Sequence, residues 1–489
     1  MELHQMSALD IGNLVKKKAV KPREVINHFA DRIAKIDPVI NAFTYTKIDE
    51  ALEEADKLEQ VIMRGEPVGP LAGVPVALKD FLPSKKGWQN SHGGVPALVQ
   101  KDTEDSVFCQ AVESVDAIVI GKTNAPAFGF RGLTDNVMYG PTSTPFKPGY
   151  NSGGSSGGSC AAVAAGLVSV AELGDAGGSA RCPAAWSGCL GYKPSAGVVP
   201  SVCRPDAWTA THPYCCGGPG TRSVADLELV FRRMVGYDPK DPINIPTPHG
   251  FMDRAKETIK GMKIGFTFDF GLFPEPDAEI KTAMLSTMVQ LGRFGADIDM
   301  IKKFNWKHTK ADFEDAWLRG ICVDTAIDME LWKKQGFDLN DYKEQLPENF
   351  FYWNRVALNS SMMNYREFHE IRTDILDAHL EVFDKFDVIL APVTGCMPVK
   401  NSEDRSSLTI GPTSISGVEV DPLIGFCYTY LENMIGTPAA SVPIGLSKDG
   451  FPIGLQVIAP RYKDADVFRI AYAIEQLQPW AWMYDKLQF

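Results

Sequence analysis

Segments with helical spacing of apolar residues alternate with short, continuously apolar segments along most of the 489-residue chain. Pro22 to Ile36 has apolar residues on one helical face, and Asp49 to Met63 repeats that pattern until Gly65 and Pro67 interrupt it. Gly73 to Leu78 is instead apolar without interruption, which is typical of a buried strand. Because helices and strands interleave from end to end, we expect an α/β fold: an α/β/α sandwich around a large mixed central β-sheet, with N-terminal helices.

The same criteria place further elements and a long loop. We expect helices over residues 7–17, 161–168 and 223–235, and strands over residues 117–121, 263–267, 388–391, 440–443 and 452–459. Gly, Ser, Thr and Pro predict a loop over residues 140–158, and the helix over 161–168 would direct its N-terminus at that loop. No repeat or linker divides the chain, so we expect one domain over 1–489, with a helical arm (1–65), a core (66–235 and 388–460) and a mainly helical region (275–390).

Composition narrows the partners and the location. The formal net charge of −12 argues against a nucleic-acid surface, which needs clustered Lys and Arg. The longest apolar segment, Cys160 to Val170, is too short to cross a bilayer, and the N-terminus has no apolar signal segment. The ten cysteines have no CxxC or zinc-site spacing, which indicates free thiols in a reducing compartment and no metal site. We therefore expect a cytoplasmic protein with neither a nucleic-acid nor a membrane partner.

Two glycine-serine loops carry the candidate chemistry. One surrounds Ser155 and the other precedes Ser179 with Gly177-Gly178. Glycines at this density suggest backbone N–H groups needed at close range, and a serine among them suggests an acyl-transfer site with an oxyanion hole. Ser155 matches the GxSxG motif of α/β-hydrolases, but the prolines before it do not suit the strand that this motif requires.

A base for either serine must come from elsewhere in the chain. No serine is followed by a lysine three residues later, so the SxxK pattern of β-lactamases is missing. Lys79 is the best-placed candidate because it ends an apolar strand, where desolvation would lower the pKa of its amine. The residues alone leave two questions open: whether Ser155 or Ser179 is the nucleophile, and whether Lys79 is only a solvated strand end.

Five segments resemble the amidase signature family of serine hydrolases in their order and spacing. They are GPLAGVPVALKDF (69–81), GKTNAPAFG (121–129), SGGSSGGS (152–159), GDAGGSARCPA (174–184) and PAASVPIGLSKDGFPIGLQVIAP (438–460). The resemblance runs from the N-terminal helices to the C-terminus, with residues 275–390 its least characteristic part. The DAGGS variant of the fourth segment is similar to the branch containing 6-aminohexanoate-cyclic-dimer hydrolase, aryl acylamidases and urethanases.

The resemblance implies a Ser–cis-Ser–Lys triad. Ser179 falls on the nucleophile, Ser155 on the bridging serine with a cis peptide bond before it, and Lys79 on the base. The expected reaction is hydrolysis of carboxamides (linear or cyclic amides, anilides, also carbamates or esters) through an acyl-enzyme, with a small-molecule substrate and without a cofactor. The family pattern places the oxyanion hole at four backbone N–H groups: those of Ala176, Gly177, Gly178 and Ser179.

Supporting, pocket and specificity residues follow from the same resemblance. Ser156, Asp175 and Arg181 should brace the loops, while Phe130 and Cys322 should lie near the substrate, in a pocket shaped by residues 275–390. Two other functions stay open: the glutaminase subunit of a tRNA-dependent amidotransferase, and a non-catalytic binding protein on the same scaffold. Cys215 stands where glutamine-using members have an aspartate, which disfavours the former. Whether the chain forms a homodimer also stays open.

Overall fold

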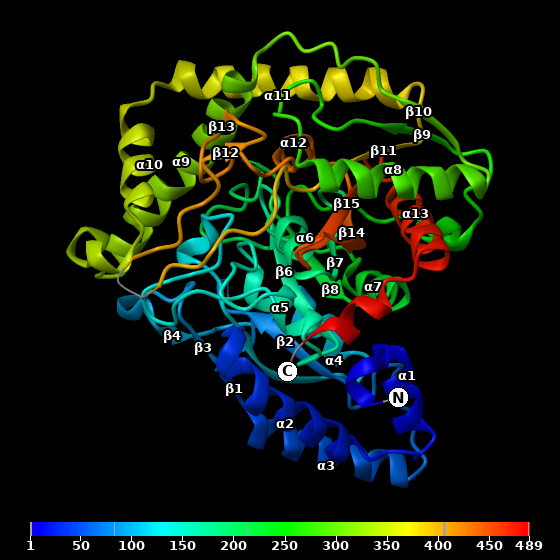
Figure 1. Cartoon of the computed structure of the whole chain (residues 1–489). Coiled ribbons are helices and arrows are strands. Elements are labelled where there is room, and N and C mark those ends of the chain that lie inside the picture. Colours follow the sequence, from blue (N-terminus) through cyan, green and yellow to red (C-terminus); the bar gives the residue numbers. More distant parts are fainter. Residues whose placement is uncertain (1, 83, 212, 404–406, 488) are drawn as a thin grey trace.

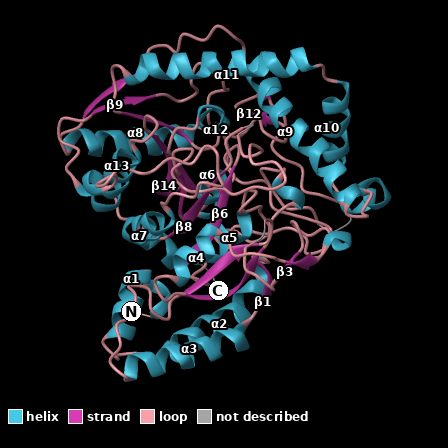
Figure 2. Cartoon of the chain, turned by 180° about the vertical axis from the view of Figure 1, so that it is seen from behind, coloured by secondary structure: helices cyan, strands magenta, loops and turns pink. Residues whose placement is uncertain are grey.

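The centre of the molecule is a mixed sheet with helices on both faces (Figures 1 and 2). The computed structural model describes residues 2–82, 84–211, 213–403, 407–487 and 489. Within them the sheet has eleven strands in the order β1-β5-β2-β6-β8-β7-β14-β15-β11-β9-β10. The strands are β1 (Phe43–Thr46), β2 (Pro75–Lys79), β5 (Ile118–Thr123), β6 (Val170–Asp175), β7 (Leu190–Lys193), β8 (Cys216–Thr221), β9 (Lys263–Phe266), β10 (Asp297–Met300), β11 (Val388–Pro392), β14 (Ala439–Leu446) and β15 (Pro452–Ile458).

The sheet combines both kinds of pairing, as the sequence predicts. β2 lies parallel between β5 and β6, whereas β8, β7, β14 and β15 pair antiparallel. Four short strands form two separate two-stranded pairs: β3 (Gln89–Asn90) with β4 (Gln100–Lys101), and β12 (Ser414–Ile415) with β13 (Val418–Glu419). The α/β fold with a large mixed sheet is thus confirmed.

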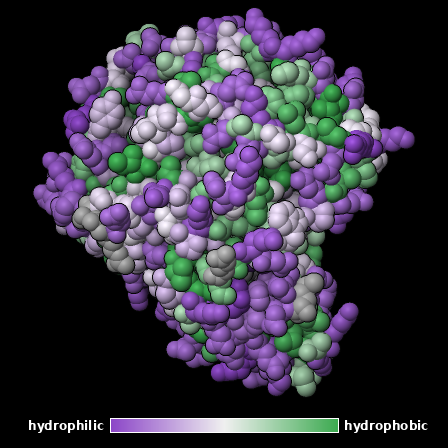
Figure 3. Space-filling view, in the orientation of Figure 1, coloured by the Kyte–Doolittle hydropathy of each residue, from purple (hydrophilic) through white to green (hydrophobic). Residues whose placement is uncertain are grey.

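Helices cover the sheet and form the two ends of the molecule in Figure 1. The α-helices are α1 (Ala8–Lys16), α2 (Pro22–Ile40), α3 (Ile48–Met63), α4 (Val107–Glu113), α5 (Gly157–Ala164), α6 (Arg181–Ser187), α7 (Val224–Met234), α8 (Ala278–Arg293), α9 (Lys310–Lys334), α10 (Glu348–Asn359), α11 (Met362–Phe383), α12 (Tyr430–Ile435) and α13 (Asp464–Leu477). Ser7 and Ser223 cap α1 and α7 through their hydroxyl oxygens, as expected of serines before a helix. The N-terminal arm, α1 to α3, has a largely polar surface in Figure 3.

The helix after the first glycine-serine loop begins earlier than its composition predicts. α5 starts at Gly157 rather than at residue 161, and all of its residues are buried. A Cβ at Gly157 would lie 2.3 Å from the Ser152 and Thr134 hydroxyl oxygens, and one at Gly158 would lie 2.4 Å from the Asn124 nitrogen. The glycines that weaken the helix signal are therefore the residues that let the first turn pack against its surroundings.

Four strands of the sheet lack a strand pattern in the sequence. β6 and β8 contain glycine or proline, β7 is only four residues long, and β10 reads DIDM with acidic residues at alternate positions. The sheet neighbours supply the packing and hydrogen bonds that local propensity does not. Residues 275–390 are otherwise mainly helical, as predicted, through α8 to α11. No helix of the described residues is both long enough and apolar enough to span a bilayer.

Candidate active site

The structure brings Lys79 and Ser155 into direct contact although they lie 76 positions apart in the chain. Lys79 is the last residue of β2 and is buried, and its Nζ donates a hydrogen bond of 2.7 Å to Ser155 Oγ. Ser155 lies just before α5 and is also buried. The Gly154–Ser155 peptide bond is cis, as the resemblance implies. The strand end and the glycine-serine loop thus meet as an amine–hydroxyl pair.

The environment of Lys79 favours the neutral amine. Burial lowers its pKa from the usual 10.5 to about 8, although Cys215, Glu172 and Asp175 act in the opposite direction. Among the described residues, the hydrogen-bond partner of Lys79 Nζ is the uncharged Ser155 hydroxyl and not a carboxylate. A lysine held in this way can accept a proton at mildly alkaline pH.

The second glycine-serine loop is wrapped around the carboxylate of Asp175. This carboxylate accepts hydrogen bonds from the Gly178 amide (2.8 Å) and the Ala180 amide (3.2 Å). It also accepts two 2.9 Å bonds from the Arg181 guanidinium. Burial alone would raise the pKa of Asp175, but the ion pair with Arg181 brings the pKa below its usual value. Asp175 and Arg181 therefore hold the loop through these hydrogen bonds.

Ser179 lies on this loop beside the Ser155 segment. The Ser156 amide donates to the Ser179 carbonyl (3.2 Å), which ties the two loops together. The Ser156 hydroxyl accepts from the Gly174 amide (3.2 Å) and donates to the Gly174 carbonyl (3.3 Å). Ser179 is partly exposed, whereas Ser155 is buried. Ser179 is thus in contact with solvent, whereas Ser155 and Lys79 are enclosed.

The four amides expected to form the oxyanion hole differ in what they contact. The Gly178 N–H is directed at Asp175, so in this structure it is engaged within the loop. Within the described part of the chain, the amides of Ala176, Gly177 and Ser179 have no recorded protein acceptor. These three remain as donors for a ligand oxygen.

Trp317 and Thr429 explain why two glycines precede Ser179. The Trp317 indole N–H donates to the Ala176 carbonyl (3.3 Å), and the Thr429 hydroxyl donates to the Gly177 carbonyl (2.7 Å). A Cβ at Gly177 would lie 2.8 Å from the indole ring, and one at Gly178 would lie 2.0 Å from the Thr429 hydroxyl oxygen. Gly178 also has a φ of +128°, which disfavours other residues. Sequence reasoning missed both side chains, because neither lies in a segment where the sequence indicated chemistry.

A buried polar network holds Arg181 from the opposite side. Its guanidinium donates to Gln456 Oε1 (2.5 Å) and Asn433 Oδ1 (2.6 Å), and it lies 3.3 Å from Glu432 Oε2. Burial alone would lower the pKa of Arg181, but the carboxylates of Asp175 and Glu432 raise it above the usual value. Gln456 lies in the fifth family-like segment, so the sequence indicated this segment but not the contact between Gln456 and Arg181. The Asp175–Arg181 pair is therefore fully partnered although it is buried.

The two expected pocket residues lie in one apolar cluster. Cys322 of α9 packs with Ile321 and with Trp353 of α10, and Phe130 packs against this cluster. The ring centroids of Phe130 and Trp353 are 5.8 Å apart at 88°, an edge-to-face contact. Burial raises the pKa of the Cys322 thiol to about 12, so the cysteine is uncharged near pH 7. Trp317 also packs against this cluster, and it links the apolar side chains to the Ser179 loop.

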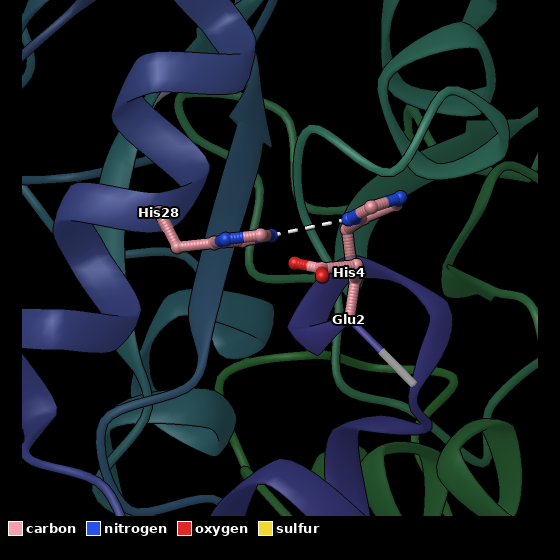
Figure 4. A group of neighbouring side chains, drawn as sticks. All are labelled: Glu2, His4 and His28. Carbon is pink, nitrogen blue, oxygen red and sulfur yellow. Dashed lines mark hydrogen bonds between the residues drawn. The ribbon is translucent and has the colours of Figure 1, made fainter.

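A separate cluster of potential metal ligands lies on the N-terminal arm (Figure 4). Glu2, His4 and His28 place ligand atoms within 4.8 Å of one another, and His4 Nδ1 lies 3.1 Å from His28 Nε2. Burial lowers the pKa of both histidines, that of His4 to about 4, and the charge of Arg32 acts in the same direction. Arg222 adds a second positive charge near His4. Because positive charge disfavours a dication, a His–His hydrogen bond is sufficient to explain this geometry.

Comparison with known proteins agrees with the fold. The amidase family model matches residues 24–468. An acylamidase from Rhodococcus erythropolis is 30% identical over 483 residues, which cover 98% of this chain and 97% of the relative. The solved structure of a bacterial aryl acylamidase of the amidase signature family has a TM-score of 0.94 and 39% identity, covering 99% of this chain and 98% of its own. One component of the glutamyl-tRNA(Gln) amidotransferase from Thermosynechococcus vestitus is 31% identical over 494 residues, covering 96% of each chain.

The family model covers most of the chain, and the curated relatives align over nearly their whole length. The resemblance of the five segments to the amidase signature family is confirmed. The expected branch, which includes aryl acylamidases, is confirmed as well. The chain therefore belongs to the amidase family and is an enzyme that hydrolyses amide bonds.

Proposed function

We propose that this amidase hydrolyses small amides with an apolar or aromatic group beside the scissile bond, through an acyl-enzyme on Ser179. The observation that carries the proposal is the 2.7 Å hydrogen bond from buried Lys79 to Ser155, beside a partly exposed serine whose loop offers free amides. These contacts support the assignment of Ser179 as nucleophile, Ser155 as proton carrier and Lys79 as base.

The proposed mechanism uses each group in turn. Neutral Lys79 accepts the Ser155 proton while Ser155 accepts the Ser179 proton, and Ser179 Oγ attacks the amide carbon. The oxyanion binds to free amides of the loop, where a single donor typically changes the rate by about 10²–10³-fold. The proton then returns through Ser155 to the leaving nitrogen as the C–N bond breaks. Water, deprotonated through the same relay, releases the acid and restores Ser179.

The substrate class is argued from the cluster around Cys322. Phe130, Ile321, Cys322 and Trp353 offer aromatic and aliphatic surface, although the charges of Asp315 and Arg319 act on the Cys322 thiol. Such a wall favours an acyl or aryl group over a charged amino acid. The names of the acylamidase relatives support the same class. Carbamates and esters with similar groups can react by the same steps, and the net charge of −12 favours a small-molecule substrate over a nucleic acid.

Glutaminase action within an amidotransferase is the second candidate, because an amidotransferase component is also among the relatives. Cys215 bears on it directly. Burial raises the pKa of the Cys215 thiol to about 12, so this side chain is neutral near pH 7. It gives no negative charge to pair with the ammonium group of glutamine, which the aspartate of glutamine-using members would provide. The acylamidase role is therefore favoured.

A substrate panel with the purified chain tests the proposal. We expect amine release from anilides and apolar amides, and none from glutamine. Ser179→Ala should abolish both this release and labelling by a fluorophosphonate, while Ser286→Ala, at an exposed serine of α8, should leave both unchanged. Full labelling of the Ser179→Ala variant would refute the assignment of the nucleophile. If glutamine were the only substrate of the panel to be hydrolysed, the second candidate would be favoured.

A further inference from the structure

The carbonyl groups of the loop before Ser179 are each held by a donor. Asn433 Nδ2 donates to the Asp175 carbonyl (2.9 Å), and the Cys182 amide donates to the Gly178 carbonyl (2.7 Å). Trp317 and Thr429 hold the two carbonyls between them. Consecutive peptide groups from Asp175 to Ser179 are thus fixed in orientation from outside the loop.

The orientation of a carbonyl also fixes the direction of an amide. In a planar trans peptide the N–H of one residue points away from the C=O of the residue before it. The donor on the Ala176 carbonyl therefore aims the Gly177 N–H, just as the donor on the Gly178 carbonyl aims the Ser179 N–H. The amides of Ala176, Gly177 and Ser179 are the ones left without a protein acceptor among the described residues.

Trp317 differs from the other three donors in its location. Asn433, Thr429 and Cys182 lie in or beside the short helices α12 and α6, next to the polar network of Arg181. Trp317 lies on α9, and its partly buried indole packs against the cluster of Ile321, Cys322 and Trp353. The Trp317 indole thus lies against this cluster, against Tyr430 of α12 and against the Gly177 backbone.

We propose that Trp317 is a positioning residue that aims the Gly177 N–H at the oxyanion and couples this orientation to the apolar wall. The inference rests on the proposed acyl-enzyme mechanism and adds to it a contribution from α9. Because an oxyanion donor acts mainly in the transition state, loss of the indole N–H should lower kcat more than it raises KM. We expect about a tenfold loss in kcat, below the 10²–10³-fold that follows removal of a donor itself.

Trp317→Phe tests this because an aromatic ring is kept, although a smaller one, and the N–H is lost. We expect kcat for an anilide to fall about tenfold, with KM changed less than about threefold. A trifluoromethyl ketone with the same acyl group, which forms a tetrahedral oxyanion on the serine, should bind weaker by the factor lost in kcat. Trp353→Phe, in the apolar wall, should change KM instead. Trp482→Phe, at an exposed tryptophan of the C-terminal 3-10 helix Ala481–Lys486, should change neither constant.

Several outcomes would overturn the inference: an unchanged kcat, a loss confined to KM, or unchanged affinity for the trifluoromethyl ketone. Complete fluorophosphonate labelling of Ser179 in the Trp317→Phe variant separates this result from failure of the acyl-enzyme mechanism itself. If phenylalanine impairs folding, 3-benzothienylalanine at position 317 keeps the size and shape of the indole and removes only the N–H. The same tenfold loss in kcat is expected of it, and wild-type kcat would refute the role of the hydrogen bond.

Discussion

In the proposed site, the loops at the ends of β2 and β6 and the helices α9 and α10 have different compositions. The loops supply buried, hydrogen-bonded polar groups, with Asp175, Arg181 and Lys79 all enclosed. The helices supply aromatic and aliphatic side chains, and their outer surface includes exposed Tyr352 and Leu358. In Figure 1 these helices lie at the opposite end of the molecule from α2 and α3.

This difference separates reactivity from selectivity. Groups in the loops depend on one another, because removing one partner leaves a buried charge or donor unpaired. Apolar walls tolerate replacement as long as their volume is roughly kept. Substitutions in the loops should therefore lower kcat or the free energy of unfolding, and substitutions in the wall should change KM and substrate preference. Trp317 is the expected exception, since it contacts both parts.

After removal of the nucleophile itself, the largest effect on turnover is expected from loss of the base. Lys79→Met removes the amine and retains most of the apolar stem, so kcat/KM should fall about 10²–10⁴-fold. Release of aniline by equal amounts of folded protein measures this. Lys122→Met is a matched control, because Lys122 is buried on the neighbouring strand β5 but pairs with Asp102 (2.5 Å) instead of a serine. It should lower the free energy of unfolding and leave kcat of the folded protein intact. Near-normal turnover by the Lys79 variant would show that the lysine is not the base.

Loss of the Asp175 charge should have the largest effect on stability. Asp175→Asn leaves the buried Arg181 guanidinium without its main counter-ion, and we expect the free energy of unfolding to fall by about 3–5 kcal/mol. Urea unfolding of the variant and the parent measures the difference. The exposed pair of Arg23 and Asp56 gives the comparison, since Asp56→Asn should cost no more than about 1 kcal/mol. Equal costs for the two variants would contradict the distinction between the loops and the surface.

Much of the fold could be predicted from the sequence because its strongest signals are local. The apolar runs ending at Lys79 and at Ala391 are strands, and the amphipathic segments from Pro22 and Asp49 are helices. β8 could not be predicted, since CGGPGT has no local tendency toward a strand and is held by β6 and β7. The early start of α5 at Gly157 has the same kind of origin, in packing rather than propensity.

The candidate site could be predicted from the sequence only where its residues lie in recognisable motifs. Lys79, Ser155 and the Asp175–Arg181 pair stand in family-like segments, and the structure brings them together. Trp317 and Thr429 could not be identified, because the backbone carbonyls that they hold lie more than a hundred residues away and leave no pattern in the chain. Gly177 and Gly178 indicate these two side chains only indirectly, because a Cβ at either glycine would lie too close to one of them.

The pH dependence of kcat/KM should reveal the lysine. Burial lowers the pKa of Lys79 from 10.5 to about 8, and only the neutral amine can accept a proton. Activity on an uncharged anilide should therefore rise tenfold per pH unit up to about pH 8 and level off above it, so that pH 6 gives about a hundredth of the plateau. Initial rates between pH 6 and pH 10 measure the profile. A rise centred near pH 10.5 would show that the lysine amine is solvated, and a flat profile would show that the lysine is not the base.

The smallest effect is expected at the apolar wall. Phe130→Ala removes one ring of the edge-to-face pair with Trp353 and part of the surface that we propose contacts an aromatic substrate. Such a contact contributes about 0.5–1.5 kcal/mol, so KM for an aromatic anilide should rise about two- to twelvefold while kcat stays within about twofold. Phe294→Ala, at a partly exposed phenylalanine next to α8, should change neither constant. For an amide with a small aliphatic acyl group, the rise in KM should be smaller, because this group contacts less of the apolar wall. If Phe130→Ala instead lowered kcat as strongly as Lys79→Met, the wall would take part in the chemistry, and the separation between loops and helices would not hold.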